Sequence, residues 1–246
     1  MPLSPSFTSI HSQEWEINFL QCYPNGYLKH TELCNLLQLT AGKHSELGAM
    51  SFTDMQKHDQ AWVLSRMRVE IDELPKWRDT VAVKTWIMDL HGSRSVRALE
   101  IWLNGKKIAG SMTYWAVINT KTGRPEALAL PHEHFEKYPD KSPTTASFNK
   151  IELNRDSEIT SNKKIVLSDL DIVFHANNVK YLEWCLDTID HHPLLKQQLQ
   201  SFDMNFLREL KLDDEVTLHK GQQDKQEYIT VVKNNKPCFA LELNWK

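Results

Sequence analysis

Apolar residues first recur at helical spacing near the start of the chain. Within residues 30–47, Leu33, Leu37 and Ala41 follow one another every four positions, and Gly48 comes directly after the segment. This spacing puts the apolar side chains on one face of a helix, and glycine is common just beyond a helix end. The pattern therefore predicts a helix over residues 30–47.

A different pattern follows, rich in β-branched and aromatic residues that often alternate with polar ones. Such runs are typical of strands. They cover residues 61–71, 80–90, 95–103 and 107–118. The pair Asn104-Gly105 separates the last two runs and predicts a tight hairpin, because a type I′ turn needs positive φ at both central positions. The first half thus reads as one helix followed by an antiparallel sheet.

The second half repeats this order after a proline-rich segment, residues 119–160, which lacks long periodicity and is expected to be a linker with a short helical piece. Residues 163–171 are expected to form a strand and residues 177–190 a helix with one apolar face. Four more strands are expected, over residues 202–210, 214–222, 226–233 and 237–245. Asn234-Asn235 stands between the last two strands, as Asn104-Gly105 does in the first half.

The two halves also share a weak sequence similarity in the same order. Residues 68–83 and 205–218 each contain an extended run, a short break, an aspartate and a valine-containing strand. Two copies of a helix with an antiparallel sheet suggest a duplication. Each copy resembles a hotdog fold, in which a curved sheet encloses one long helix, so the expected fold class is α+β, a tandem (double) hotdog.

Composition narrows the class of protein. The chain has 246 residues, 41% of them hydrophobic and 25% charged, with a net charge of −3, so a packed core is expected and nucleic-acid binding is not. The four cysteines are widely spaced, which argues against a disulfide framework or a zinc site. No signal peptide and no membrane span are visible, and a cytoplasmic protein is expected.

The segment SDLDIVFHANNVKYLEWC, residues 168–185, concentrates the candidate chemistry. Asp171, Val173 and His175 alternate at the expected strand end, so their side chains should share one face. A histidine can carry a proton near neutral pH, and a carboxylate can orient it. The corresponding first-half sequence, YPNGYLKHTEL, has no such pair, which favours one active site, in the second half, over a turn histidine with only a structural role.

The start of the second-half helix offers a second candidate feature. Asn177 or Asn178 can cap the helix through a side-chain oxygen. Backbone N–H groups near Asn178 and Val179 could stabilise a developing oxyanion, because a helix start carries free donors and a positive dipole end.

These residues resemble the signature of the acyl-acyl carrier protein thioesterases of plants and bacteria, Asp-Leu-Asp-x-Asn-x-His-x-Asn-Asn-x-Lys-Tyr. The matching positions are Asp169, Leu170, Asp171, His175, Asn177, Asn178, Lys180 and Tyr181. The segment WVLSRMRVEIDELPKWRDTVAVKTW, residues 62–86, is similar to a second family segment. The resemblance can be followed from residue 15 to residue 245.

The resemblance implies hydrolysis of the thioester that joins a fatty acyl chain to acyl carrier protein, with release of the free fatty acid and an end to elongation. It implies Asp171, His175 and Glu209 as catalytic residues. We expect water as the nucleophile, Glu209 alone or with Asp171 as the base, and His175 among the groups that stabilise the oxyanion. Acyl carrier protein is then the partner, and no cofactor or metal is expected.

The resemblance also implies a division of labour along the chain. Residues 1–125 would form an N-terminal hotdog that binds the acyl chain, residues 126–160 a linker, and residues 161–246 the catalytic hotdog. Acyl-chain length is expected to be set in the first half, where six of the eight tryptophans lie. The sequence leaves the oligomeric state open, a homodimer included.

Two departures from the family pattern keep alternatives open. Val173 stands where the family has an asparagine, and Leu210 stands where the plant enzymes have a cysteine after the glutamate. Valine has no hydrogen-bonding side chain. The alternatives are an acyl-CoA thioesterase of hotdog type and a non-catalytic acyl-binding protein. The histidines in residues 132–135 and 190–192 are expected to be surface residues rather than metal ligands.

Overall fold

The computed structural model of the protein describes residues 2–246. By packing, the chain divides into two compact units. Unit 1 comprises the residues up to Ser65 and Asp72–Ser147, and unit 2 comprises Arg66–Ile71 and Phe148–Lys246. No helix in this described range is long and apolar enough to cross a lipid bilayer.

Unit 1 is built on an antiparallel sheet whose strand order is β1-β3-β4-β5-β2. Its elements are β1 (Ile10–Glu16), the 3-10 helix η1 (Phe19–Gln21), α1 (His30–Leu47), α2 (Phe52–Gln56), the first part of β2 (Gln60–Ile71), β3 (Thr80–His91), β4 (Arg94–Leu103) and β5 (Lys106–Asn119). The four strands expected from the alternating runs are all present. The short elements β1 and α2 were not predicted, because neither has enough apolar residues to give a clear period.

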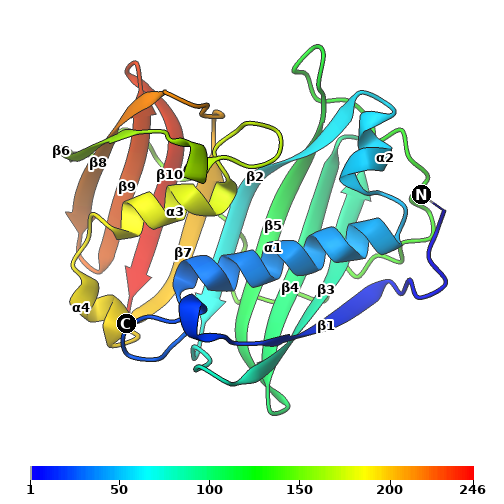
Figure 1. The fold of residues 1–246 in the computed structure, drawn as a ribbon, viewed down its shortest axis with the longest axis horizontal. Coiled ribbons are helices and arrows are strands. Elements are labelled where there is room, and N and C mark those ends of the chain that lie inside the picture. The colour runs from blue at the N-terminus through cyan, green and yellow to red at the C-terminus, as the bar shows by residue number, and fades with distance from the viewer. Residues whose placement is uncertain (1) are drawn as a thin grey trace. The chain divides into compact units, whose positions relative to one another are not determined.

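Helix α1 lies across one face of this sheet (Figure 1). Leu33 and Leu37 are fully buried under it, as their spacing predicts. A polar contact adds to the packing, because Trp15 Nε1 of β1 donates to Thr40 Oγ1 at 3.0 Å. The helix predicted over residues 30–47 is confirmed.

Unit 2 repeats this plan with the strand order β2-β7-β10-β9-β8-β6, in which the paired strands run antiparallel. Its elements are the last part of β2, β6 (Glu158–Lys164), the 3-10 helix η2 (Leu167–Asp169), α3 (Asn178–Leu186), α4 (His191–Leu195), β7 (Leu199–Phe206), β8 (Glu215–Gln223), β9 (Gln226–Lys233) and β10 (Lys236–Trp245). Helix α3 packs against β9 and β10. The α+β class and the repeated helix-and-sheet plan are therefore confirmed.

The predicted helix over residues 177–190 is wrong at its C-terminal end. Helix α3 stops at Leu186, and α4 begins separately at His191. The side chain of Asp190 accepts a hydrogen bond from the backbone N–H of His192 at 3.0 Å. This cap starts a new helix where the apolar period alone suggested that one helix continued.

Both hairpin predictions are confirmed by the backbone. Asn104 and Gly105 have φ values of 50° and 79°, and Asn234 and Asn235 have values of 49° and 59°. Positive φ at both central positions is the requirement of a type I′ turn. Each pair thus sets the register of the strands on either side.

The proline-rich segment between the two halves contains no helix or strand within residues 120–157, so the short helical piece expected there is absent. The segment nevertheless packs closely on both units. A Cβ at Gly110 of β5 would lie 2.0 Å from the carbonyl oxygen of Pro143, so only glycine admits this contact. Farther along, the N–H of Asn149 donates to buried Asp203 at 3.2 Å. These contacts attach the segment to the sheet of each unit.

Candidate active site

The chain before α3 forms a compact turn rather than a strand. Strand β6 ends at Lys164, η2 follows, and Asp169 Oδ2 accepts from the N–H of Val166 at 2.9 Å. The N–H of Asp171 then donates to the carbonyl oxygen of His175 at 2.8 Å. The predicted strand over residues 163–171 is therefore wrong beyond residue 164, and strand alternation does not explain where the candidate side chains lie.

Asp171 holds this turn through its carboxylate. Its Oδ1 accepts from the backbone N–H groups of Val173 at 3.0 Å and His175 at 3.2 Å. A short carboxylate that binds its own backbone in this way is a common turn-forming device. The contact fixes the backbone of His175. The Oδ1 atom of Asp171 therefore holds the turn that carries His175.

Glu209 meets His175 from the other side. Glu209 lies after β7, in the loop that also contains Lys211, which forms a β-bridge with His175. The Glu209 Oε2 atom lies 3.3 Å from His175 Nε2. The His175 side chain is 28% exposed and that of Glu209 is 52% exposed, so the pair is accessible to water. A carboxylate held by an imidazole and open to solvent can accept a proton from a water molecule.

The start of α3 is capped by Asn177. Its Oδ1 accepts from the N–H of Val179 at 2.9 Å. The N–H of Val179 is thereby engaged, which contradicts the expectation that it is a free oxyanion donor. Asn178 is the first residue of α3. The capping role expected for Asn177 or Asn178 belongs to Asn177.

The two positions that depart from the family pattern have different surroundings. Val173 is 38% exposed at the tip of the turn, where its side chain can add no hydrogen bond. Leu210 is fully buried, and its N–H donates to the hydroxyl of Tyr181 at 3.1 Å. Burial raises the pKa of Tyr181, which keeps this phenol neutral. Tyr181 therefore holds the loop that carries Glu209.

Tyr181 is part of the family pattern, but the pattern does not indicate what its side chain contacts. The signal available in the sequence was its position four residues after the capping Asn177, which places it one turn into the helix. Its partner on the Glu209 loop, however, is 29 residues away in the chain. No local pattern predicts a contact at that separation.

Unit 1 contains the same backbone arrangement before α1. The N–H of Tyr23 donates to the carbonyl oxygen of Tyr27 at 2.8 Å, as Asp171 does to His175. The N–H of Leu28 donates to Pro75 at 2.9 Å, as that of Ala176 does to Leu210 at 2.8 Å. Tyr27 bridges to Lys76, as His175 bridges to Lys211. The corresponding positions can thus be assigned residue by residue.

Different side chains occupy these shared positions. Tyr23 corresponds to Asp171, Tyr27 to His175 and buried Leu74 to Glu209. The same backbone therefore forms without a carboxylate or an imidazole at any of the three positions. The fold does not require the polar set of unit 2, and a chemical role explains it better.

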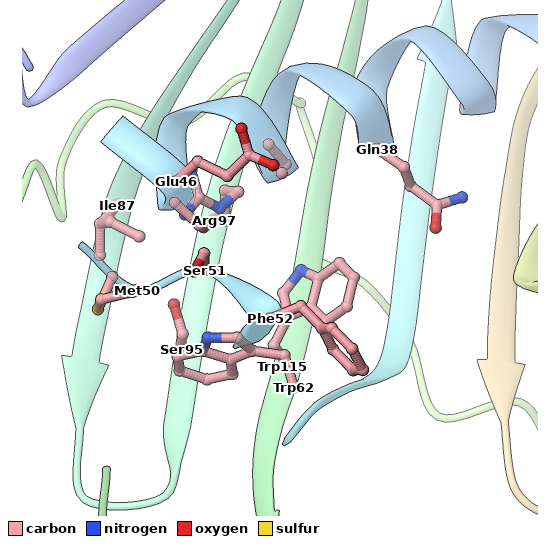
Figure 2. A pocket seen from close by; sticks show the side chains of 13 residues that line it. Gln38, Glu46, Met50, Ser51, Phe52, Trp62, Ile87, Ser95, Arg97 and Trp115 are labelled. Atoms are coloured by element: carbon pink, nitrogen blue, oxygen red, sulfur yellow. The ribbon is translucent and has the colours of Figure 1, made fainter. Parts of the chain in front are cut away.

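A cavity of about 300 Å³ lies in unit 1. The rings of Phe52, Trp62 and Trp115 line one part of it, and Arg97 lines another part, beside α1 (Figure 2). Trp86, in contrast, is fully buried and donates to the carbonyl oxygen of Lys141. Only some of the tryptophans of the first half thus face a space that a ligand could enter.

The histidine cluster at residues 190–192 is a surface feature, whereas His132 and His134 are half-buried. Asp190, His191 and His192 lie close together, but all three are exposed, and Asp190 is already the cap of α4. His132 and His134 bind backbone carbonyl oxygens at 2.9 Å. Exposed acidic and imidazole groups of this kind do not by themselves indicate a metal ion.

Comparison with known proteins gives a consistent result. The family model of the acyl-ACP thioesterase N-terminal domain matches residues 8–138, and that of the C-terminal domain matches residues 152–237. The oleoyl-acyl carrier protein thioesterase of Coriandrum sativum is 26% identical over 87% of this chain and 64% of its own length. The palmitoyl-acyl carrier protein thioesterase of Arabidopsis thaliana is 29% identical over 73% of this chain and 47% of its own length. The chain thus spans about half to two thirds of the length of these curated relatives.

Solved structures agree on the fold. An acyl-ACP thioesterase from Bacteroides thetaiotaomicron superposes with a TM-score of 0.88 at 22% identity, covering 97% of this chain and 98% of its own. The 12:0-ACP thioesterase from Umbellularia californica superposes with a TM-score of 0.82 at 20% identity, with the same coverage. These likenesses confirm the tandem hotdog architecture. With both domain models matched along most of its length, the chain belongs to the acyl-ACP thioesterase family.

Proposed function

We propose that this protein hydrolyses the thioester of fatty acyl-acyl carrier protein, which releases a free fatty acid and ends its elongation. The observation that carries the proposal is the His175–Glu209 pair, with Nε2 and Oε2 3.3 Å apart. Unit 1 builds the same backbone with Tyr27 and Leu74 in these places. Family membership supplies the substrate class, since the matched relatives are named for acyl carrier protein substrates.

In the proposed mechanism, Glu209 is the general base. Its carboxylate takes a proton from a water molecule as the water oxygen attacks the thioester carbonyl carbon. The carbon–sulfur bond of the tetrahedral intermediate then breaks, and the thiolate takes the proton from Glu209. A thiolate is a good leaving group, so the second step needs little further assistance.

The neighbouring residues prepare Glu209 for this step. His175 Nε2 holds Oε2 of the carboxylate, which leaves the other oxygen to face water. Asp171 fixes the backbone of His175 through the bond to its N–H. Because Asn177 engages the N–H of Val179, we assign stabilisation of the oxyanion to His175 rather than to that N–H.

The division of labour implied by the family is part of this proposal. We infer that residues 1–125 bind the acyl chain, that residues 126–160 link the two parts, and that residues 161–246 carry the catalysis. The apolar cavity of unit 1 supports the first assignment, because an acyl chain needs an apolar slot. Acyl carrier protein is the proposed partner, and the cytoplasmic location stays a prediction.

The test is to incubate the full chain with acyl carrier protein and with coenzyme A, each loaded with the same acyl chains. Hydrolysis is measured as the release of free thiol. We expect fast release from the carrier protein and slow release from CoA. Equal rates would favour the acyl-CoA thioesterase. Binding without release from either would show that the protein is an acyl-chain binder and that Val173 marks a silenced site.

Variants test the assigned residues. Glu209→Gln should lower kcat about 10²- to 10⁴-fold, the range for loss of a general base, while the fold is kept. Asp171→Ala should also lower turnover, because it removes the oxygen that accepts from the backbone N–H of His175. Glu215→Gln, an exposed carboxylate at the start of β8, is the matched control and should leave turnover unchanged. Near-normal rates in both site variants would overturn the assignment.

A further inference from the structure

We propose that the cavity of unit 1 binds an apolar chain that ends in a carboxylate, with Arg97 as the partner of that carboxylate. Arg97 lies on β4 and is only 5% exposed, yet it lines the cavity. This inference rests on unit 1 alone and needs no thioester chemistry.

The contacts of Arg97 are all with neutral groups. Its Nη1 donates to His44 Nδ1 at 2.8 Å and to Thr85 Oγ1 at 3.2 Å. Its Nη2 donates to Ser45 Oγ at 3.2 Å. Three of the five N–H donors of the guanidinium are thus engaged. The donors left are the N–H of Nε and one on Nη2, a pair that a carboxylate can accept side by side.

No carboxylate among the described residues forms an ion pair with Arg97. Glu46 also lines the cavity, but its side chain is 52% exposed and lies 3.5 Å from Lys43, which offsets its charge. A buried cation without a counter-charge is costly, and removal from water costs more than neutral hydrogen bonds return. A ligand carboxylate would supply the missing charge.

His44 cannot supply a negative charge, and it does not compete with Arg97 as a cation. Burial, together with the charge of Arg97, lowers the pKa of His44 to about 2. Its Nε2 lies 3.0 Å from the carbonyl oxygen of Thr8. The proton is therefore on Nε2, and Nδ1 accepts from Arg97. The imidazole is a neutral acceptor that orients the guanidinium.

The rest of the cavity suits an apolar chain. Phe52, Trp62 and Trp115 line it, and its volume of about 300 Å³ is at the low end of the range for small-molecule pockets. One short aliphatic chain fits this space better than a ring system or a nucleotide. The arrangement of a cation and aromatic walls is therefore that of a site for a short fatty carboxylate.

Two sources could provide such a ligand. One is the fatty acid released by the reaction, an identification that rests on the proposed function. The other is an acyl substrate that carries a second carboxylate at its far end. The chemistry recognised by Arg97 is the same in both.

Binding is tested on the full chain without any thioester, by titrating octanoate and octanol and following tryptophan fluorescence, since Trp62 and Trp115 line the cavity. Octanoate should bind about tenfold to a hundredfold more tightly than octanol, as expected for a charged hydrogen-bonded pair. Arg97→Gln should abolish this preference. Arg94→Gln, an exposed arginine at the start of the same strand, should keep it.

Equal binding of octanoate and octanol by the unaltered protein would overturn the proposal, and this comparison holds even if Arg97→Gln does not fold. Measurements of thioester turnover identify the source of the carboxylate ligand. Inhibition by octanoate that is lost in Arg97→Gln points to the released product. A larger loss of octanedioyl-thioester turnover than of octanoyl-thioester turnover in Arg97→Gln points to a carboxylated substrate. An inactive enzyme that still prefers octanoate would contradict the proposed function but not this site.

Discussion

At the scale of single residues, the two units form the same turn with different amino acids. Gly26 in unit 1 and Phe174 in unit 2 occupy corresponding positions and have φ values of 82° and 62°. Only glycine adopts this left-handed conformation without cost. Phe174 is also 72% exposed, so packing does not compensate for the strained backbone. Unit 2 therefore keeps a less favourable residue directly beside His175.

Substitutions at these two positions should change the free energy of unfolding in a predictable way. Gly26→Ala should lower the free energy of unfolding by about 1 kcal/mol, through the backbone alone, because no atom lies within 4 Å of the added Cβ. Phe174→Gly should not destabilise the protein. Denaturant unfolding measures both. A stable Gly26→Ala variant would show that this turn tolerates a side chain at no cost.

The residues of the candidate site could be predicted where the family pattern includes them. Their contacts could not be predicted, because these depend on how the chain folds. His175 and Glu209 meet although they are 34 positions apart, and only the resemblance linked them beforehand. Strand alternation failed for Asp171, because a side chain that binds its own backbone replaces the strand with a turn. The hydrogen bond from the N–H of Val179 to Asn177 could not be predicted either, since Asn177 and Asn178 were equally good candidates for the cap.

At the scale of elements, the two long helices begin differently. Helix α3 has the side-chain cap of Asn177, whereas Lys29 at the start of α1 provides no side-chain cap. The backbone at both positions is extended, with φ near −60° and ψ near 140°. Asparagine is among the preferred residues in this conformation, and lysine is not.

Removing the cap of α3 and introducing one at α1 should change the free energy of unfolding in opposite directions. Asn177→Ala should cost about 1 kcal/mol, and Lys29→Asn should add roughly 0.5 kcal/mol, because it gives α1 a side-chain oxygen that can accept from an N–H group of its first turn. Thermal and denaturant unfolding of the two variants give the values. If Lys29→Asn lowers stability, the hydrogen bond from Lys29 Nζ to the carbonyl oxygen of Leu20 matters more than the cap.

Elements were predicted best where the apolar period is long. Residues 30–47 gave the helix α1 with its observed ends, since several turns repeat the pattern. The period failed around residues 187–190, where a single aspartate begins a new helix. Strand β1 was missed because Ile10–Glu16 is mostly polar, and it is held instead by its pairing with β3.

At the scale of the whole molecule, unit 1 contains two buried histidines that resist protonation. His30 is 1% exposed, and burial lowers its pKa to about 4. His44 is fully buried, with a pKa lowered to about 2. In the unfolded chain both should titrate near 6.5.

Stability should therefore fall as the pH drops below 6.5. Above this pH the histidines are neutral in both states and have no effect. Below it the unfolded chain binds protons that the folded chain refuses, down to about pH 4 for His30. The loss for His30 is on the order of 3 kcal/mol over this range. Denaturant unfolding at about pH 7 and about pH 5 measures it.

His30→Gln isolates the contribution of His30. The variant should show a flatter dependence of unfolding free energy on pH than the unaltered protein. His91→Gln, which changes an exposed histidine at the end of β3, should keep the original slope. An unchanged slope in His30→Gln would mean that another group controls the acid response.

The position of strand β2 limits how the N-terminal and C-terminal halves of family members can be combined in one hybrid chain. Its last part belongs to unit 2, where buried Arg68 forms an ion pair with buried Asp203 of β7. A crossover in the proline-rich segment would carry Asp203 into the hybrid and leave Arg68 behind, 135 positions away. A buried carboxylate without its partner is strongly destabilising. Halves should therefore be exchanged between relatives without a large loss of stability only when one parent supplies this arginine and the other this aspartate.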